Sequence, residues 1–99
     1  MLIKRFKEPV PKKVRKNVQK YLQNNGLGEL VEVRRASDHP EDHYLYHVIA
    51  KIGVTFSCWT SWNETTQSMN FGHYGLTYEE CDSVLKEHFH RISGVNVID

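Results

Sequence analysis

The sequence is poor in cysteine and has no long hydrophobic run. Its two cysteines, Cys58 and Cys81, are too few for a disulfide framework and lack the CxxC spacing of a structural zinc site. The longest apolar runs fall far short of the roughly 18 residues that a membrane-spanning helix needs, and the opening MLIKRFKEPVP is too charged for a signal peptide. We therefore expect a cytoplasmic protein with free, buried thiols and no membrane partner.

The length and composition fit one domain. A chain of 99 residues with 39% hydrophobic content can bury one core but is too short for a second. The sequence shows no internal repeat, low-complexity stretch or linker. We expect residues 1–99 to form a single domain, in which residues 1–25 are a basic N-terminal arm and helix.

Charge is sorted along the chain. Residues 1–20 carry eight lysines and arginines and one acid, Glu8, which gives +7; because the whole chain is +1, the remainder carries −6. Clustered basic residues gain affinity for phosphates by releasing counterions, so this segment predicts contact with nucleic acid or another acidic partner. The alternative is that it packs against the acidic remainder of its own chain.

The basic segment contains an expected amphipathic helix. It begins near Pro9 or Pro11, because proline is tolerated in a first turn. It runs to about Asn24, and Gly26 stops it. Its apolar stripe consists of Val14, Val18, Tyr21 and Leu22. The residues that we predict to bind a polyanion occupy the rest of its circumference: Lys12, Lys13, Arg15, Lys16 and Lys20.

The middle of the chain predicts antiparallel strands. Candidate strands are ELVEVRRA from residue 29, YLYHVIA from 44, VTFSCWTSW from 54 and QSMNFGHY from 67. A three-residue loop over 51–53, with Gly53 in the left-handed position, places Ala50 opposite Val54. The next turn, opened by Asn63, places Trp62 opposite Gln67 and Cys58 opposite Phe71.

A second helix is expected from Thr77, because Thr77 and Glu80 form a capping box, and it ends at Gly94. Its predicted buried face consists of Tyr78, Cys81, Leu85, His88, Phe89 and Ile92. A short last strand follows over 95–98. The expected fold is α+β: a two-layer sandwich with an antiparallel sheet of three to five strands and two helices, one N-terminal and one near the C-terminus, on one face.

The sheet face opposite the helices is a second candidate surface. We predict that it binds through Leu45, His47, Trp59, Asn70 and Tyr74. The apolar area of this face is larger than a surface without a binding function usually exposes. The alternative is that Trp59 lies over Gly72 simply to stabilise the sheet. Three groups are candidates to bind this face: unpaired bases, a protein partner such as a second copy of the chain, or the loop 37–43 of the same chain.

The six histidines form no recognisable catalytic or metal motif. The loop DHPEDH, residues 38–43, offers nitrogen and oxygen donors, but its spacing matches no defined site and is typical of a solvated loop. Cys58, His73, Cys81 and His88 face one predicted layer, either as a ligand set or as ordinary core residues. We expect no cofactor, metal or catalytic residue.

These patterns predict a small non-enzymatic binding protein. The sharpest hypothesis is contact with nucleic acid or an acidic partner through the basic helix. The strongest rival is a protein-interaction or homodimerising module that uses the open sheet face. An enzyme built on a Cys/His metal site or thiol is the third alternative.

Overall fold

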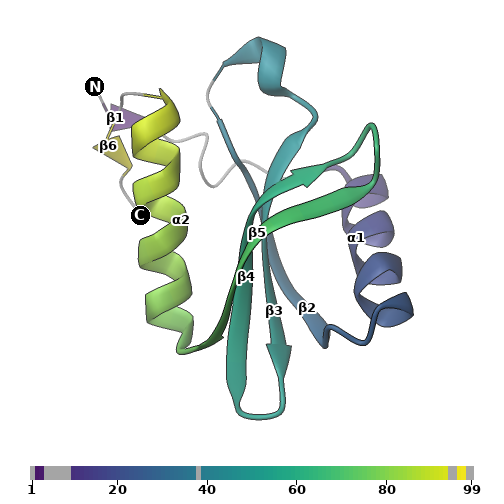
Figure 1. Ribbon diagram of the computed structural model, residues 1–99. Coiled ribbons are helices and arrows are strands. Elements are labelled where there is room, and N and C mark those ends of the chain that lie inside the picture. The colour runs from purple at the N-terminus through teal and green to yellow at the C-terminus, as the bar shows by residue number, and fades with distance from the viewer. Residues whose placement is uncertain (1, 4–9, 38, 94–95, 98–99) are drawn as a thin grey trace.

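The computed structural model describes residues 2–3, 10–37, 39–93 and 96–97 (Figure 1). Its main sheet is antiparallel with the strand order β2-β3-β4-β5. The strands are β2 (Glu29–Arg35), β3 (Leu45–Ile52), β4 (Thr55–Asn63) and β5 (Ser68–Leu76). The helices are α1 (Lys12–Asn24), α2 (Tyr78–Ser93) and a 3-10 turn (Pro40–Asp42). A parallel pair joins β1 (Leu2–Ile3) to β6 (Asn96–Val97) beside the sheet.

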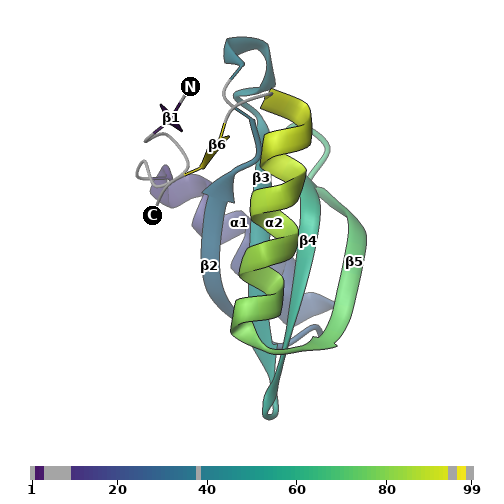
Figure 2. The same ribbon diagram turned by 90° about the vertical axis from the view of Figure 1, so that its left-hand side faces the viewer.

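The two helices cover opposite faces of the sheet (Figure 1, Figure 2). Successive strand residues point to opposite faces, and β3 is buried on both. Val48 packs in the α1 cluster with Val18, whereas the adjacent Ile49 packs with Cys81 and Leu85 of α2. The expected α+β class, with two terminal helices and a four-stranded antiparallel sheet, is confirmed. The expected placement of both helices on one face is wrong.

The β3–β4 hairpin has a tighter turn than expected. Ile52 pairs with Thr55, so the loop is the two-residue turn Gly53-Val54, with Gly53 at φ 61°. Glycine at the first central position satisfies such a turn without forcing Ile52 to positive φ. Ala50 therefore lies opposite Ser57, not Val54. The pairing of β4 with β3 is thus shifted by three residues from the expected one. Because this shift is odd, the β4 side chains that we expected on one face of β3 lie on the other face.

A bulge in β4 then brings both tryptophans to the α1 face. Val48 pairs with Trp59 and Tyr46 with Trp62, so two β4 residues lie opposite His47 alone. In a regular strand, side chains three positions apart point to opposite faces; the extra residue cancels that difference. Both tryptophan side chains are buried in the α1 cluster.

The β4–β5 register differs from the expected one by two residues. Trp62 pairs with Met69 and Cys58 with His73. The turn between the strands is capped as expected, because Asn63 Oδ1 accepts hydrogen bonds from the backbone N–H groups of Thr65 and Thr66.

The glycine opposite Trp59 is also confirmed as a close approach. Gly72 pairs with Trp59, and a Cβ added there would lie 2.8 Å from Trp59 Nε1 and would overlap the Tyr74 hydroxyl. Trp59 Nε1 donates a hydrogen bond of 3.2 Å to that hydroxyl. Only a residue without a side chain leaves room for this pair.

Both helix ends predicted by local signals are present. Gly26 follows α1 with φ 63°, and Thr77 and Glu80 exchange two hydrogen bonds at the start of α2, of 2.9 and 3.1 Å. Ile92 is 42% exposed, although we expected it on the buried face. The expected stop at Gly94 lies outside the described residues, as do residues 95 and 98 of the expected last strand, whereas residues 96–97 form β6. No helix among the described residues is long and apolar enough to cross a membrane.

Candidate functional site

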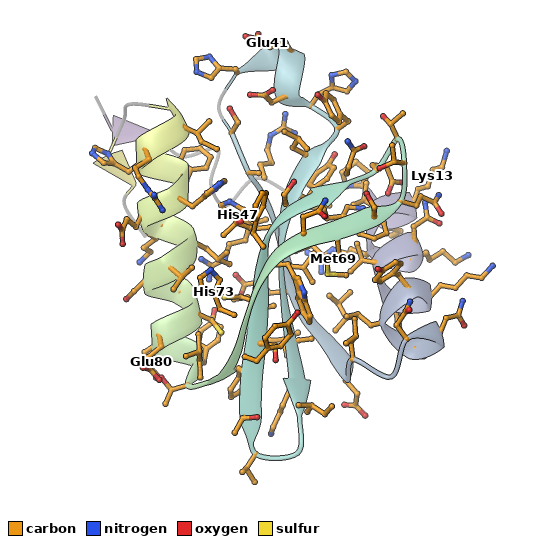
Figure 3. All side chains as sticks on the ribbon, viewed as in Figure 1. Lys13, Glu41, His47, Met69, His73 and Glu80 are labelled. Atoms are coloured by element: carbon orange, nitrogen blue, oxygen red, sulfur yellow. The ribbon has the colours of Figure 1, made fainter. Side chains whose placement is uncertain are left out.

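The outer face of α1 is a cluster of basic side chains. Val14, Val18 and Leu22 point inward and are buried, which turns the remaining circumference to solvent. All five residues that we predicted to bind a polyanion are exposed on it: Lys12, Lys13, Arg15, Lys16 and Lys20. Figure 3 shows Lys13 on the side of α1 that points away from the sheet. We call these five residues the basic face.

The basic face keeps its positive charge as far as the described residues are concerned. Among the described residues, no carboxylate forms an ion pair with any of the five. The first turn of α1 contains no acid, and Lys12 and Lys13 lie there, at the positive end of the helix dipole. Basic residues at that end disfavour the helix by about 0.3–1 kcal/mol each, so they do not serve helix stability.

Amide side chains lie between the lysines of this face. A shallow depression of about 400 Å³ on α1 is lined by Lys16, Asn17, Gln19, Lys20 and Gln23. Ammonium and amide groups are both donors that contact phosphate and sugar oxygens in nucleic-acid complexes. The basic face therefore offers hydrogen-bond donors as well as positive charge.

Glu64 fixes α1 to the sheet below the basic face. Its carboxylate accepts hydrogen bonds from Trp62 Nε1 at 2.9 Å and from Asn17 Nδ2 at 2.7 Å. The ring of Tyr21 also meets Trp62 edge to face, with centroids 5.4 Å apart. The helix is thus held in one orientation, with its basic residues outward.

The residues predicted to form an open sheet face do not share a surface. His47 is fully buried toward α2, Trp59 is buried toward α1, and Leu45 is half-buried. Asn70 and Tyr74 are exposed on β5. The prediction that these five side chains form one binding surface is therefore wrong, because each sheet face is covered by a helix and the β3–β4 register is shifted.

A buried polar network that sequence patterns did not reveal joins α2 to β2. Arg34 is buried and forms ion pairs with Glu32 and, at 2.7 Å, with Asp82. The Tyr78 hydroxyl donates a hydrogen bond of 2.6 Å to Glu32 and accepts one from Arg34. Burial lowers the pKa of Arg34, but the hydrogen bonds and charges of the two acids outweigh this effect and raise it. Arg34 is therefore a permanent cation inside the α2 interface.

Two histidines meet in the same interface. His47 Nε2 lies 3.0 Å from His88 Nδ1, and the two rings pack edge to face. Burial, with further contributions from His88 and Arg34, holds the pKa of His47 well below its usual range. Burial and then Arg91 also lower the pKa of His88. Both imidazoles are therefore neutral at pH 7.

The two cysteines also meet, on β4 and α2. Cys58 and Cys81 are fully buried in one cluster as free thiols. Burial, with the neighbouring Cys81, raises the pKa of Cys58 to about 12, and burial also raises the pKa of Cys81. A thiol that stays protonated is a poor nucleophile and metal ligand. Of the four residues whose convergence we considered, Cys58 and Cys81 form a thiol pair and His88 pairs with His47. His73 is exposed on β5 and lines a pocket together with His88.

The expected donor loop is described except for Asp38, which lies outside the described residues. His39, Glu41 and His43 are exposed. Across the part of the chain that the structure describes, no group of three or more histidine, cysteine, aspartate or glutamate side chains is arranged to hold a metal ion.

A family model described as "Large polyvalent protein associated domain 24" matches residues 4–80. The match includes α1 and all four strands of the main sheet, and it ends in the first turn of α2. Searches of the curated proteins and of the solved structures found no match.

Proposed function

We propose that this chain, which belongs to the large polyvalent protein associated domain 24 family, is a non-enzymatic domain that binds nucleic acid through the basic face of α1. The observation that carries the proposal is the set of five exposed basic side chains on one helix, with no ion-pair partner among the described residues. Such a set gains affinity for a polyanion by releasing counterions from its phosphates.

The amide groups beside the basic face also suit a nucleic acid. The exposed Gln19 and Gln23 lie beside Lys16 and Lys20 along the surface of α1. Phosphates and sugars accept hydrogen bonds from both kinds of side chain. The alternative that the segment serves only to pack against the acidic remainder of its own chain is disfavoured for α1, because its basic side chains point to solvent.

The proposal includes a role as one binding module and a cytoplasmic location. The family name describes a domain associated with large polyvalent proteins, which suits a binding unit used beside other activities. The free thiols of Cys58 and Cys81, in one buried cluster, suit a reducing compartment.

The alternative function is binding of a protein partner or of a second copy of the chain. The surface for such a partner is not the sheet face that we predicted but the outer strand β5. The outer strand β5 exposes two aromatic side chains, Phe71 at 74% and Tyr74 at 62%. Exposed aromatics on an edge strand are typical of interaction surfaces. Binding there would be less sensitive to salt than binding at the basic face.

The test is the salt dependence of binding to a mixed-sequence single-stranded oligonucleotide, measured by fluorescence anisotropy. Five neutralised phosphates predict a slope of log K against log salt of about −3.5, at about −0.7 per contact. Charge reversal of Lys13, Lys16 and Lys20 should reduce the slope by about 2 or abolish binding. The control is Lys51→Glu, which reverses an exposed lysine outside α1.

Three results would contradict the proposal: no binding at low salt, binding that salt does not weaken, or equal losses in the triple variant and in the control. Light-scattering mass of the same samples tests the rival. A dimer that Tyr74→Glu dissociates, with no oligonucleotide bound, would assign the function to β5.

A further inference from the structure

We propose that a pocket between β5 and α2 binds a nucleoside monophosphate, at a site separate from the basic face. The pocket has a volume of about 410 Å³, within the range of about 300–1,000 Å³ typical of small-molecule sites. Phe71 and His73 of β5 line one side, and Glu87, His88 and Arg91 of α2 line the other. Figure 3 shows His73 on the α2 side of the sheet, opposite from Lys13.

The nitrogen donors of the pocket suit a phosphate group. Arg91 supplies a permanent positive charge, and His73 and His88 supply imidazoles. The Nδ1 atom of His88 lies 3.0 Å from Nε2 of the buried His47, which leaves His88 Nε2 for a ligand. In the tautomer in which His88 Nδ1 accepts from His47, the neutral ring carries its proton on Nε2 and can donate it to a phosphate oxygen. A guanidinium beside imidazoles is a favourable setting for a phosphate dianion, because charge-assisted hydrogen bonds are the stronger ones.

Glu87 makes the pocket suitable for more than a bare anion. It lies four residues before Arg91, yet within the described residues no ion pair joins the two side chains. Its carboxylate is therefore an available acceptor beside the cation. Ribose hydroxyls and the exocyclic amines of bases are donors of the kind that a carboxylate accepts. Inorganic phosphate has neither of these groups.

The rim of the pocket offers a surface for the base. Phe71 is 74% exposed and has φ 59°, a left-handed conformation that a bulky side chain rarely adopts. Such outliers persist only where the surrounding structure determines them, and they cluster at ligand sites. Here the conformation holds an aromatic ring at the pocket instead of in the core. Aromatic rings in this position stack bases without regard to their identity.

The test is a titration with adenosine 5′-monophosphate, followed through the imidazole and backbone NMR signals of the whole chain. We expect the signals of His73 and His88 to shift in a saturable manner, with inorganic phosphate and adenosine alone each binding at least about fivefold more weakly. Phe71→Gly should weaken binding at least about fivefold, and Arg91→Gln about tenfold or more.

The glycine variant is informative because φ 59° suits glycine, so the ring is lost without a backbone penalty. Phe71→Tyr keeps a ring and should retain binding, and Glu41→Gln, an exposed change outside the pocket, should leave affinity within about twofold. Three results would overturn the proposal: no shift of His73 and His88, equal affinity for inorganic phosphate, or shifts confined to α1. The last result would leave the proposed function of the basic face untouched.

Discussion

The buried histidine pair makes the stability of the fold depend on pH in a defined direction. His47 is fully buried and its Nε2 lies 3.0 Å from His88 Nδ1, with Arg34 and Arg91 close enough to disfavour a further positive charge. Burial holds the pKa of both imidazoles below the usual value of a histidine. The folded protein therefore binds fewer protons than the unfolded chain at mildly acidic pH.

The size of the effect follows from proton linkage. An unfolded histidine has a pKa of about 6.5, so the stabilisation is fully present above that pH and is lost as the pH falls toward the lowered folded-state values. For an imidazole that stays neutral in the folded state over this whole range, the free energy of unfolding falls by about 1.4 kcal/mol per pH unit below pH 6.5. A loss of about 2 kcal/mol at pH 5 is therefore the most that His47 contributes. His88 acts in the same direction. A loss of 2 kcal/mol lowers the melting temperature of a chain this short by roughly 8–16 °C.

Urea denaturation at pH 7.5 and pH 5.0 measures this loss for the wild type and for His47→Gln. Glutamine keeps a polar group beside His88 but does not titrate, so this variant should be less stable at pH 7.5 yet lose clearly less stability on acidification. His39→Gln, an exposed histidine in the loop, is the matched control and should behave like the wild type. An equally large loss in His47→Gln, or no loss in the wild type, would refute the role given to the pair.

Three further predictions concern packing, capping and the thiols. Gly72→Ala should lower the free energy of unfolding by about 1–3 kcal/mol in urea denaturation, since a Cβ would overlap Tyr74; an unchanged value would contradict the close approach. Thr77→Ala should cost about 1 kcal/mol through loss of the α2 cap, whereas the neighbouring Glu79→Gln should cost less than about 0.5 kcal/mol; equal costs would rule out a specific cap. Cys58, with its pKa raised to about 12 by burial and by Cys81, should resist a thiol reagent at pH 8 in the folded protein and react once urea is added; rapid labelling of the folded protein would show that the thiol is accessible.

Local signals in the sequence were sufficient for the helices and for the basic face. The spacing of Val14, Val18 and Leu22 determines both which side of α1 is buried and which side carries the lysines, so no tertiary information was needed. The capping pair Thr77 and Glu80 likewise acts within one turn of chain. These predictions depend only on contacts between residues fewer than ten positions apart in the sequence.

The two sides of the sheet were harder to predict, because the α2 interface is polar. Arg34 and His47 are buried there, although such residues normally indicate a solvated face. The tighter β3–β4 turn moves Trp59 from the expected open face into the α1 cluster. The bulge opposite His47, which has no recognisable sequence signal, places Trp62 on the same face. The pocket depends on β5 and α2 meeting and on the positive φ of Phe71, neither of which periodicity predicts.

Because both tryptophans lie on the α1 face, tryptophan fluorescence reports on one side of the sheet and not on the other. Trp59 and Trp62 are the only tryptophans of the chain, and each indole N–H has its own partner, Tyr74 for one and Glu64 for the other. Ultraviolet emission excited at the indole band therefore monitors the α1 layer, whereas far-ultraviolet circular dichroism sums both helices. If α2 separates from the sheet before α1 does, ellipticity will fall while the emission maximum stays in place.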